Sequence, residues 1–272
     1  MKAMRWLFIV AGTVLGFYLI LLGALYLWQS HLVFFPQRML RANPSAYRLE
    51  YEDVTIEAGR EMIHAWFLEG RPGQPVVLLC HGNAGNISDR LDKILAIHRE
   101  GLGVLAFDYA GYGWSTGSPS EDQMYTDAQA AFAWLLKRGY TPNRIILYGE
   151  SLGGAVAAQL ATTVRPVLLV LESAFTTLED VARRHYPWVP VGWLMKYRFD
   201  TRAFLDRVNT KIVVIHSPFD EVVPVELGRE LCRGRESHCR FMETTGSHNT
   251  MPMVPWSDVL KQNGLKHDPP GS

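Results

Sequence analysis

The sequence predicts an α/β fold with a mostly parallel sheet, helices on both faces and a minimal lid, preceded by one N-terminal transmembrane helix. Two observations carry this prediction. Short apolar runs alternate with segments long enough for helices, and such runs are typical of parallel strands buried on both faces. The runs are PVVLLC, GVLAFD, RIILYG, PVLLVLES and KIVVIHS. The second observation is that residues 6–28 contain no charged residue.

The composition excludes several functional classes. The 272 residues carry a formal net charge of zero, without a long basic stripe, which argues against a nucleic-acid binder. No C-x-x-C pair and no H-E-x-x-H motif is present, so no metal site is expected. The apolar fraction, 48%, is ordinary for a globular protein, and a sizeable core is expected.

The apolar N-terminus is long enough to cross a bilayer, which takes about 20 residues. Trp6, Tyr26 and Trp28 lie near its ends, where aromatic rings favour the membrane interface. A cleaved signal peptide would have a shorter apolar part ending in small residues, whereas this one ends in LYLWQSHLVFF. A buried soluble helix is the other alternative, but this segment is apolar on every face. We interpret residues 1–30 as an uncleaved, single-pass membrane anchor in contact with the lipid bilayer.

The side of the membrane is harder to predict. Lys2 and Arg5 precede the apolar run, while Arg38 and Arg41 follow it, so the distribution of positive charge does not decide the orientation. A short basic start before an apolar run resembles a signal anchor. We therefore expect the C-terminal domain to be extracytoplasmic.

The rest of the chain divides into three parts. Residues 31–48 form a proline-containing connector, residues 49–263 the folded domain, and residues 264–272 a flexible tail. Within the domain, YEDVTIEA and MIHAWFLE alternate as antiparallel strands do. Helices are expected over 88–99, 121–138 and 152–163, and a last strand at CRFMET.

Residues 183–198 interrupt the strand–helix alternation. They mix Pro, Trp and Tyr without periodicity, so a small lid over a site and surface padding both remain open. A further hypothesis is that YPWVPVGWLM within this segment faces the bilayer and admits a lipid-like acyl chain.

The three cysteines are compatible with more than one arrangement. Cys80 ends an apolar strand and is expected to be a small buried residue. Cys232 and Cys239 pair if the domain lies in an oxidising compartment, but two free thiols fit the sequence equally well.

A strand runs directly into a helix at Gly149-Glu150-Ser151-Leu152-Gly153. A G-x-S-x-G sequence at such a junction is typical of a nucleophile elbow, in which small neighbours allow the serine a strained turn. The motif alone is a weak signal, because glycine and serine are common turn residues.

Two later residues complete a catalytic triad in the order that this architecture requires, which is serine, acid, histidine. Asp220 follows the strand KIVVIHS, and His248 follows the strand CRFMET. Taken singly, Asp220 is an ordinary turn residue and His248 a loop histidine. Together with Ser151 they predict a nucleophile, an orienting acid and a base. Glu172, at the end of another parallel strand, is the second candidate for the acid.

An oxyanion hole needs two backbone N–H donors. Leu152 supplies the first, directly after the nucleophile. The loop HGNAGN supplies the second, most plausibly through Asn83. A phosphate-binding loop would need a terminal Lys-Ser/Thr pair, which is missing here. The predicted chemistry requires no cofactor.

From about residue 32 to 249 the chain resembles the α/β-hydrolase superfamily, and within it the membrane-anchored alpha/beta-hydrolase-domain (ABHD) proteins. The resemblance rests on LVFFPQR, HGNAGNISDRL, FDYAGYGWSTGSPSE, LYGESLGGAVA, LESAFTTLEDVA, FDEVVP and GSHN. It implies the α/β-hydrolase fold, the triad Ser151, Asp220 and His248, and hydrolysis of esters or thioesters with lipid-like acyl groups.

The chain departs from the family pattern at four places. Ala110 and Glu150 stand where the family usually or often has arginine, HSPFD replaces a more typical HGDRD, and Thr250 replaces a common aspartate. The triad residues are retained, so these departures bear on substrate preference.

The sequence therefore predicts a membrane-anchored serine hydrolase that cleaves carboxylic ester or thioester bonds in small-molecule or lipid-like substrates. Two alternatives stay open. One is a serine peptidase or aminopeptidase on the same fold, and the other is a non-catalytic membrane-anchored scaffold.

Overall fold

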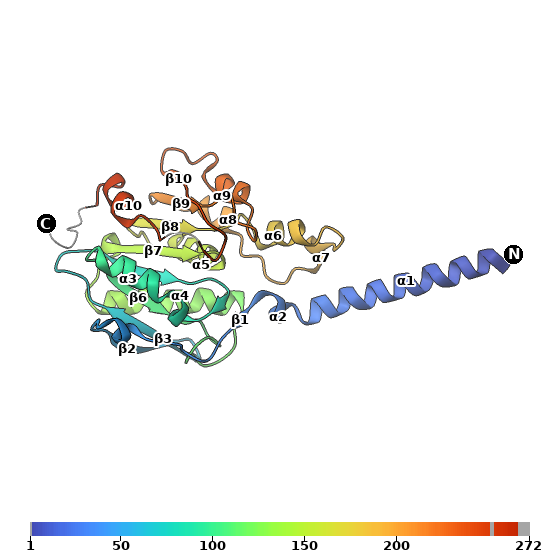
Figure 1. The fold of residues 1–272 in the computed structure, drawn as a ribbon, viewed down its shortest axis with the longest axis horizontal. Coiled ribbons are helices and arrows are strands. Elements are labelled where there is room, and N and C mark those ends of the chain that lie inside the picture. The colour runs from blue at the N-terminus through green and yellow to red at the C-terminus, as the bar shows by residue number, and fades with distance from the viewer. Residues whose placement is uncertain (1, 251–252, 266–272) are drawn as a thin grey trace.

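A computed structural model describes residues 2–250 and 253–265 of the chain. It shows a domain built on one large sheet and a long N-terminal helix that projects from it (Figure 1). Of the predicted flexible tail, only residues 264–265 are described, and the remainder lies outside the described residues.

The central sheet has eight strands in the order β10-β9-β8-β7-β4-β6-β3-β2. The two strands predicted to be antiparallel, β2 and β3, form one edge, and β3 pairs antiparallel with β6. All other neighbours are parallel, which confirms the predicted mostly parallel sheet. The strands are β2 (Glu52–Ala58), β3 (Glu61–Leu68), β4 (Val76–Cys80), β6 (Gly103–Phe107), β7 (Ile145–Glu150), β8 (Leu168–Glu172), β9 (Ile212–His216) and β10 (Cys239–Glu243).

Helices cover both faces of this sheet, as the continuous apolar strands require. Along β4, Val76, Leu78 and Cys80 face one core, while Val77 and Leu79 face the other, because successive strand side chains point to opposite faces. The first core is closed by α4 (Glu121–Lys137), α5 (Leu152–Ala161), α8 (Thr201–Leu205) and α9 (Val225–Cys232). The second is closed by α3 (Leu91–Arg99) and α10 (Trp256–Gln262).

The helix predicted from residue 88 begins differently. A 3₁₀ turn, η2 (Ile87–Arg90), precedes α3, and Asn86 caps this turn through its side chain. Two more 3₁₀ turns are η1 (Pro44–Tyr47) and η3 (Pro142–Arg144). An Asn cap competes with regular helical bonding locally, so a boundary of this kind is poorly predicted from periodicity.

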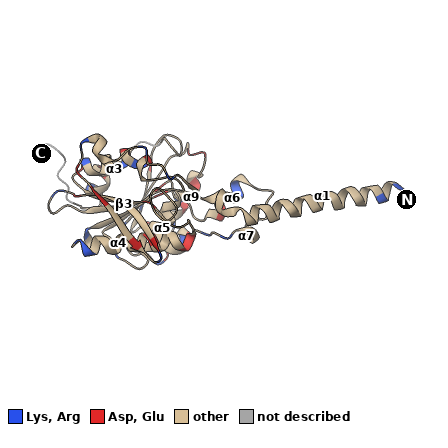
Figure 2. Cartoon of the chain, turned by 90° about the horizontal axis from the view of Figure 1, so that it is seen from below, with Lys and Arg blue, Asp and Glu red and all other residues tan. Residues whose placement is uncertain are grey.

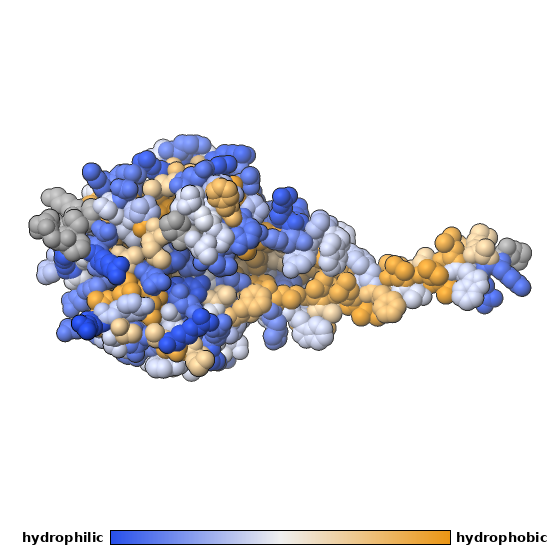
Figure 3. Space-filling model, viewed as in Figure 1, coloured by the Kyte–Doolittle hydropathy of each residue, from blue (hydrophilic) through white to orange (hydrophobic). Residues whose placement is uncertain are grey.

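The N-terminal helix α1 (Lys2–Leu27) has a mean hydropathy of 2.4, and its apolar window is not buried by the domain. Its 26 residues span about 39 Å, enough by length and composition to cross a membrane. Figure 2 shows that the charged residues of α1 lie only at its N-terminal end, and Figure 3 shows the apolar surface continuing to the junction with the domain.

The connector after α1 is part of the folded domain. The short helix α2 (Gln29–Val33) leads into β1 (Phe35–Pro36), which pairs in parallel with β5 (Ala84–Gly85). Phe34, only 3% exposed, packs in the larger core. The exit of the long helix is therefore joined directly to the loop that follows β4.

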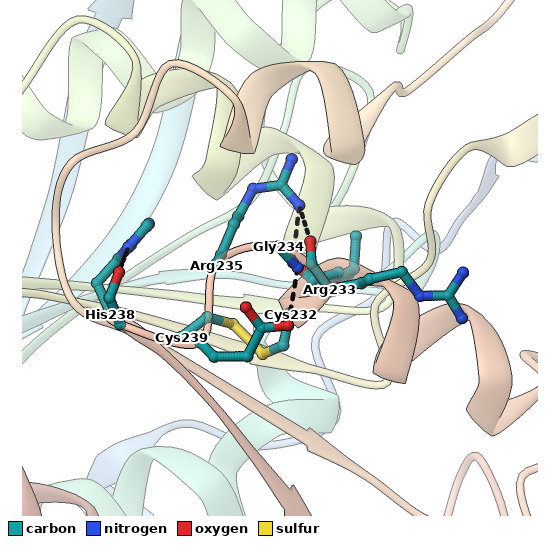
Figure 4. Close-up of a disulfide and its surroundings, with 9 residues drawn as sticks. Cys232, Arg233, Gly234, Arg235, His238 and Cys239 are labelled. Carbon is teal, nitrogen blue, oxygen red and sulfur yellow. Dashed lines mark hydrogen bonds between the residues drawn. A yellow bond between two sulfur atoms is a disulfide. The ribbon is translucent and has the colours of Figure 1, made fainter.

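Two features complete the fold. Between β8 and α8 the chain leaves the sheet as α6 (Leu178–His185) and α7 (Val191–Leu194), which extend on the same side as α1 (Figure 1). We call residues 178–195 the cap. At the other edge, a disulfide between Cys232 and Cys239 joins the end of α9 to the start of β10 (Figure 4). Cys80 is a buried free cysteine, as predicted.

Candidate active site

The residues singled out in the sequence gather at the carboxyl edge of the sheet. The connection from β4 leads to β6 on one side, and the chain then returns to β7 on the other side of β4. In open parallel sheets such a reversal leaves a crevice beyond the strand ends. Asn83 and Ser151 follow these two adjacent strands, β4 and β7.

Ser151 occupies a sharp turn between β7 and α5. Its φ of 52° and ψ of −118° are unusual for a residue with a side chain. Such strained backbone persists where the surrounding structure holds it, and its amide donates to the Glu172 carbonyl at 2.8 Å. Ser151 is 7% exposed, so its hydroxyl lies just beneath the surface.

The flanking glycines are explained by close backbone approach. A Cβ atom at Gly153 would lie 2.1 Å from the carbonyl oxygen of Cys80, at the end of β4. A Cβ at Gly149 would lie 2.4 Å from the carbonyl oxygen of Gly153. The first turn of α5 therefore packs directly against β4, and only glycine fits at these two positions.

Asp220 and His248 are joined by a hydrogen bond of 2.8 Å between Asp220 Oδ2 and His248 Nδ1. The other carboxylate oxygen accepts the backbone N–H groups of Val222 and Val223 at 3.0 and 2.8 Å. Burial acts to raise the pKa of Asp220, but hydrogen bonds from His216, His248 and the Val223 amide outweigh it and lower the pKa. This aspartate is therefore held ionised.

The loop that carries His248 is tied to the loop that carries Asp220. Ser217 donates to the carbonyl of Gly246 at 2.5 Å, and Glu221 accepts the backbone N–H of His248 at 3.1 Å. Ser217 belongs to HSPFD, so this departure from the family pattern supplies one contact that holds the histidine loop, and Glu221 of the matching FDEVVP supplies the other.

Thr250 is a second departure with a local role. Its hydroxyl accepts the backbone N–H of Ser247 at 3.1 Å, and its own backbone N–H donates to the Ser247 carbonyl at 3.1 Å. These bonds close the turn that carries His248.

The described contacts contain no hydrogen bond between Ser151 and His248. Asp220 follows β9, two positions from β7 in the sheet, and strands lie about 4.8 Å apart. His248 must therefore reach back across the edge toward Ser151, and catalytic hydrogen bonds are often long in unliganded enzymes.

The loop after β4 orients the Gly82–Asn83 peptide. The buried His81 donates through Nδ1 to the carbonyl of Gly82 at 2.7 Å. In a trans peptide the N–H points opposite to the C=O, so this bond also sets the direction of the Asn83 N–H. The Asn83 carbonyl accepts from the Tyr112 hydroxyl at 2.7 Å and from the Phe35 amide of β1 at 2.9 Å.

Leu152, the other predicted donor, is the first residue of α5. The first N–H groups of a helix have no acceptor within the helix, and they carry the positive end of its dipole. The Leu152 N–H is therefore available at the edge where Ser151 lies.

A buried group of charges lies behind the serine. Glu150 accepts two hydrogen bonds from the Arg90 guanidinium, at 3.1 and 3.3 Å, and lies 3.4 Å from Lys93 Nζ. Burial acts to raise the pKa of Glu150, but Arg90 and Lys93 outweigh it and lower the pKa well below its usual value. Arg90 also donates to the Ala84 carbonyl at 2.7 Å, which links Glu150 to the loop after β4.

Glu172, the second candidate for the acid, belongs to the same group. Its carboxylate accepts from Lys93 Nζ at 2.8 Å and from the Tyr148 hydroxyl, and the residue is 2% exposed. The contacts of Glu172 thus run to Lys93 and Tyr148, whereas those of Asp220 run to His248.

Ala110, the remaining departure, is buried, and its amide donates to Asp127 of α4 at 2.8 Å. Burial raises the pKa of Asp127 to about 6, although the bonds from Ala110 and Gln123 oppose this.

Three further residues with roles at the site were not assigned from the sequence. They are His81, which orients the Gly82–Asn83 peptide, Arg90, which holds Glu150, and His216, whose Nε2 lies 3.3 Å from Asp220 Oδ2. His81 and His216 directly follow or end apolar strands, which was the available signal. No such signal marked Arg90 in the sequence, because its partner Glu150 is 60 positions away in the chain.

This fold and edge geometry define an α/β hydrolase. A family model described as alpha/beta hydrolase fold matches residues 75–203. The chain belongs to the α/β-hydrolase superfamily, as the motifs predicted.

Sequence relatives narrow the position of the chain within this superfamily. The chain is 36% identical over 232 residues to the protein Rv2307c of Mycobacterium tuberculosis, covering 83% of each chain. It is 34% identical over 212 residues to the lysophosphatidylserine lipase ABHD12 of Gallus gallus, covering 66% of this chain and 55% of that protein. Its relatives thus include ABHD proteins, as expected.

Among solved structures, the Pyrococcus furiosus esterase Pf2001 shares the fold. The TM-score is 0.67 at 20% sequence identity, covering 85% of this chain and 95% of the esterase. The family and the lipase relative together support a hydrolase, and the esterase structure shows the same fold.

Proposed function

We propose that the chain is a membrane-anchored serine hydrolase that cleaves carboxylic ester or thioester bonds through an acyl-enzyme. The observation that carries this proposal is the Asp220–His248 hydrogen bond, at the sheet edge that also holds the strained Ser151 turn. An alcohol nucleophile needs a base, and the base needs an orienting carboxylate.

In the proposed mechanism Ser151 attacks the acyl carbonyl while His248 Nε2 takes its proton. Asp220, held ionised by its amide and imidazole donors, keeps the Nδ1–H tautomer and stabilises the imidazolium that forms. His248 then protonates the leaving oxygen or sulfur, and water repeats the sequence to release the acid.

The negative charge of the tetrahedral intermediate is stabilised by the backbone N–H groups of Asn83 and Leu152. His81 supports the first by fixing the Gly82 carbonyl, and the start of α5 supports the second. One such donor contributes roughly 3–4 kcal/mol to transition-state stabilisation in well-studied hydrolases.

A lipid-like acyl substrate fits the setting of the site. The lipase ABHD12 is a relative, and the long apolar helix α1 ends beside the loop after β4. We propose that α1 anchors the protein and that the domain is extracytoplasmic. The Cys232–Cys239 disulfide supports this location, since disulfides persist in oxidising compartments.

The proposal is tested with a fluorophosphonate probe and a panel of p-nitrophenyl esters and acyl thioesters on the detergent-solubilised chain. Ser151→Ala is expected to lose both labelling and turnover, while Ser173→Ala, also at a positive φ (51°), keeps both. Labelling that persists in Ser151→Ala would move the nucleophile elsewhere.

The same panel separates the alternatives. A peptidase would cleave aminoacyl arylamides faster than esters, and a scaffold would react with no serine-directed probe. We expect ester or thioester cleavage to exceed arylamide cleavage.

A further inference from the structure

The C-terminal half of the cap, residues 186–195, has an unusual distribution of charge. Residues 186–195 contain no charged side chain, yet Arg183 and Arg184 precede them and Lys196 and Arg198 follow. Figure 2 shows basic residues in α6, close to the domain end of α1. An apolar stretch between basic flanks is typical of segments that enter a membrane interface.

The apolar side chains of this stretch face outward. Trp193 is 93% exposed, Trp188 54% and Tyr186 53%. Large aromatic residues grouped on a surface mark a contact site, and tryptophan and tyrosine are favoured where a membrane meets water.

The stretch contacts α1 near one end and α2, which directly follows α1, at the other. The Tyr18 hydroxyl of α1 donates to the Trp188 carbonyl at 2.9 Å. The side chain of Gln29 donates to the Leu194 carbonyl at 2.9 Å and accepts the backbone N–H of Lys196 at 2.6 Å. Residues 186–195 therefore share the environment of the last turns of α1, whether that is water or lipid.

These contacts fix the depth of the cap relative to the helix. Lys196 Nζ lies 4.1 Å from the centre of the Tyr26 ring, a pair suited to the headgroup level. Tyr18 is two turns further along α1, about 12 Å away. Half of a bilayer core is about 15 Å, so Trp188 lies within one leaflet when Tyr26 is at the interface.

Many backbone groups of the stretch are already hydrogen-bonded within the protein, as insertion into lipid requires. The amides of Val189, Val191, Trp193 and Met195 all donate to carbonyls within residues 186–191, and Pro187 and Pro190 have no N–H. The carbonyl of Trp188 accepts from Tyr18 of α1, and that of Leu194 accepts from Gln29 of α2. Each unpaired backbone group costs several kcal/mol in lipid, so these hydrogen bonds lower the free-energy cost of inserting the stretch.

We infer that residues 186–195 insert into the leaflet nearest the domain, beside α1, with a phospholipid bilayer as their partner. Arg183, Arg184 and Lys196 lie at the level of the lipid phosphates. The inference rests on the proposed membrane anchor and is independent of the proposed triad. It places the cap, at the carboxyl edge of the sheet, in direct contact with lipid.

Depth-dependent fluorescence quenching tests this in the full chain, reconstituted in phosphatidylcholine vesicles. Trp188→Cys, Trp193→Cys and Lys196→Cys are each labelled with a polarity-sensitive thiol dye. Cys80 is buried and the other two cysteines are paired, so the label goes to the introduced thiol. Lipids spin-labelled near the headgroup or at mid-chain act as quenchers.

Two control positions complete the experiment. Leu15→Cys lies on the exposed surface of α1 and reports on the anchor, and Lys137→Cys, at the far end of α4, reports on the domain surface. We expect loss of fluorescence at 188 and 193 with both quenchers, at 196 mainly with the headgroup quencher, and none at 137.

The outcomes separate the two proposals. If the dyes at 188 and 193 behave like the dye at 137 while the dye at 15 is quenched, the anchor holds and cap insertion is overturned. If the dye at 15 is not quenched either, the anchor itself is wrong and the inference falls with it. Fluorophosphonate labelling of the same samples reports separately on Ser151.

Discussion

Around Ser151, each charged residue is matched by a specific partner. Glu150 stands beside the proposed nucleophile, where an unpaired carboxylate would repel the developing oxyanion. Arg90 and Lys93 neutralise it from behind, so its charge is used within the buried group. A residue that departs from the family pattern is thereby accommodated by two cations from η2 and α3.

The choice of acid is tested by comparing Asp220→Asn with Glu172→Gln. Asparagine presents the wrong hydrogen-bonding pattern to the imidazole, so we expect kcat to fall by roughly 10³–10⁴-fold. Glutamine at 172 disturbs Lys93 and Tyr148, not His248, and should cost far less activity. Ester turnover per folded molecule is measured, with the thermal midpoint as a check. The opposite ranking would assign the acid to Glu172.

Arg90 is expected to act as a positioning residue. Arg90→Met leaves Glu150 with Lys93 alone and frees the Ala84 carbonyl, which should lower stability by roughly 3 kcal/mol. We also expect kcat to fall with KM nearly unchanged. The loop after β4, which carries the proposed oxyanion donor Asn83, loses its hydrogen bond from Arg90. Steady-state kinetics at a temperature where the variant is folded provide the measurement. If kcat of Arg90→Met is unchanged, the role of Arg90 is purely structural. As a control, Arg90→Lys should restore the free energy of unfolding more fully than it restores kcat.

At the level of secondary-structure elements, the connections are pinned by a few buried polar contacts. Asp127 of α4 holds the turn after β6 through Ala110, and the disulfide holds α9 to β10. Both lie away from the triad and affect stability rather than chemistry.

Asp127 predicts a pH dependence of stability. Its pKa in the folded protein is raised to about 6, against about 3.9 in an unfolded chain. The folded state therefore binds more protons between these values, and this group makes stability fall by about 3 kcal/mol as pH rises from 3 to 7. The free energy of unfolding of Asp127→Asn, relative to that of the parent, should therefore rise by that amount over the same pH range. Urea unfolding at several pH values measures it, and a pH-independent difference would contradict it.

The disulfide closes a short loop, with a sequence separation of 7 between its cysteines. Loop-closure entropy predicts a stabilisation of about 2–3 kcal/mol. Dithiothreitol should lower the thermal midpoint of the parent chain but leave the Cys232→Ser/Cys239→Ser double variant unaffected. If both thiols react with an alkylating agent before reduction, the pairing is absent.

At the scale of the whole molecule, the long helix α1, the loop after β4 and the cap are connected. Strand β1 hydrogen-bonds to the loop after β4, and the cap hydrogen-bonds to α1 and α2. The carboxyl edge of the sheet, with Ser151, therefore lies on the side from which α1 projects (Figure 1). A membrane that holds α1 would face this edge, which suits a substrate arriving from the lipid phase.

Much of this arrangement was predictable from local patterns. Continuous apolar runs identify strands buried on both faces, and the residues after those runs, such as Ser151 and Asp220, lie at the functional edge by the geometry of parallel sheets. These features depend on periodicity and chain direction, which are properties of neighbouring residues.

Other features required the folded chain. The partners of Glu150, the pairing of Cys232 with Cys239 and the contact of Tyr18 with the cap join residues that are separated in sequence or equally able to remain apart. Composition and spacing do not specify such contacts, because many pairings satisfy the same local pattern. Only the packing of the strands selects one set, by bringing particular loops within hydrogen-bonding distance.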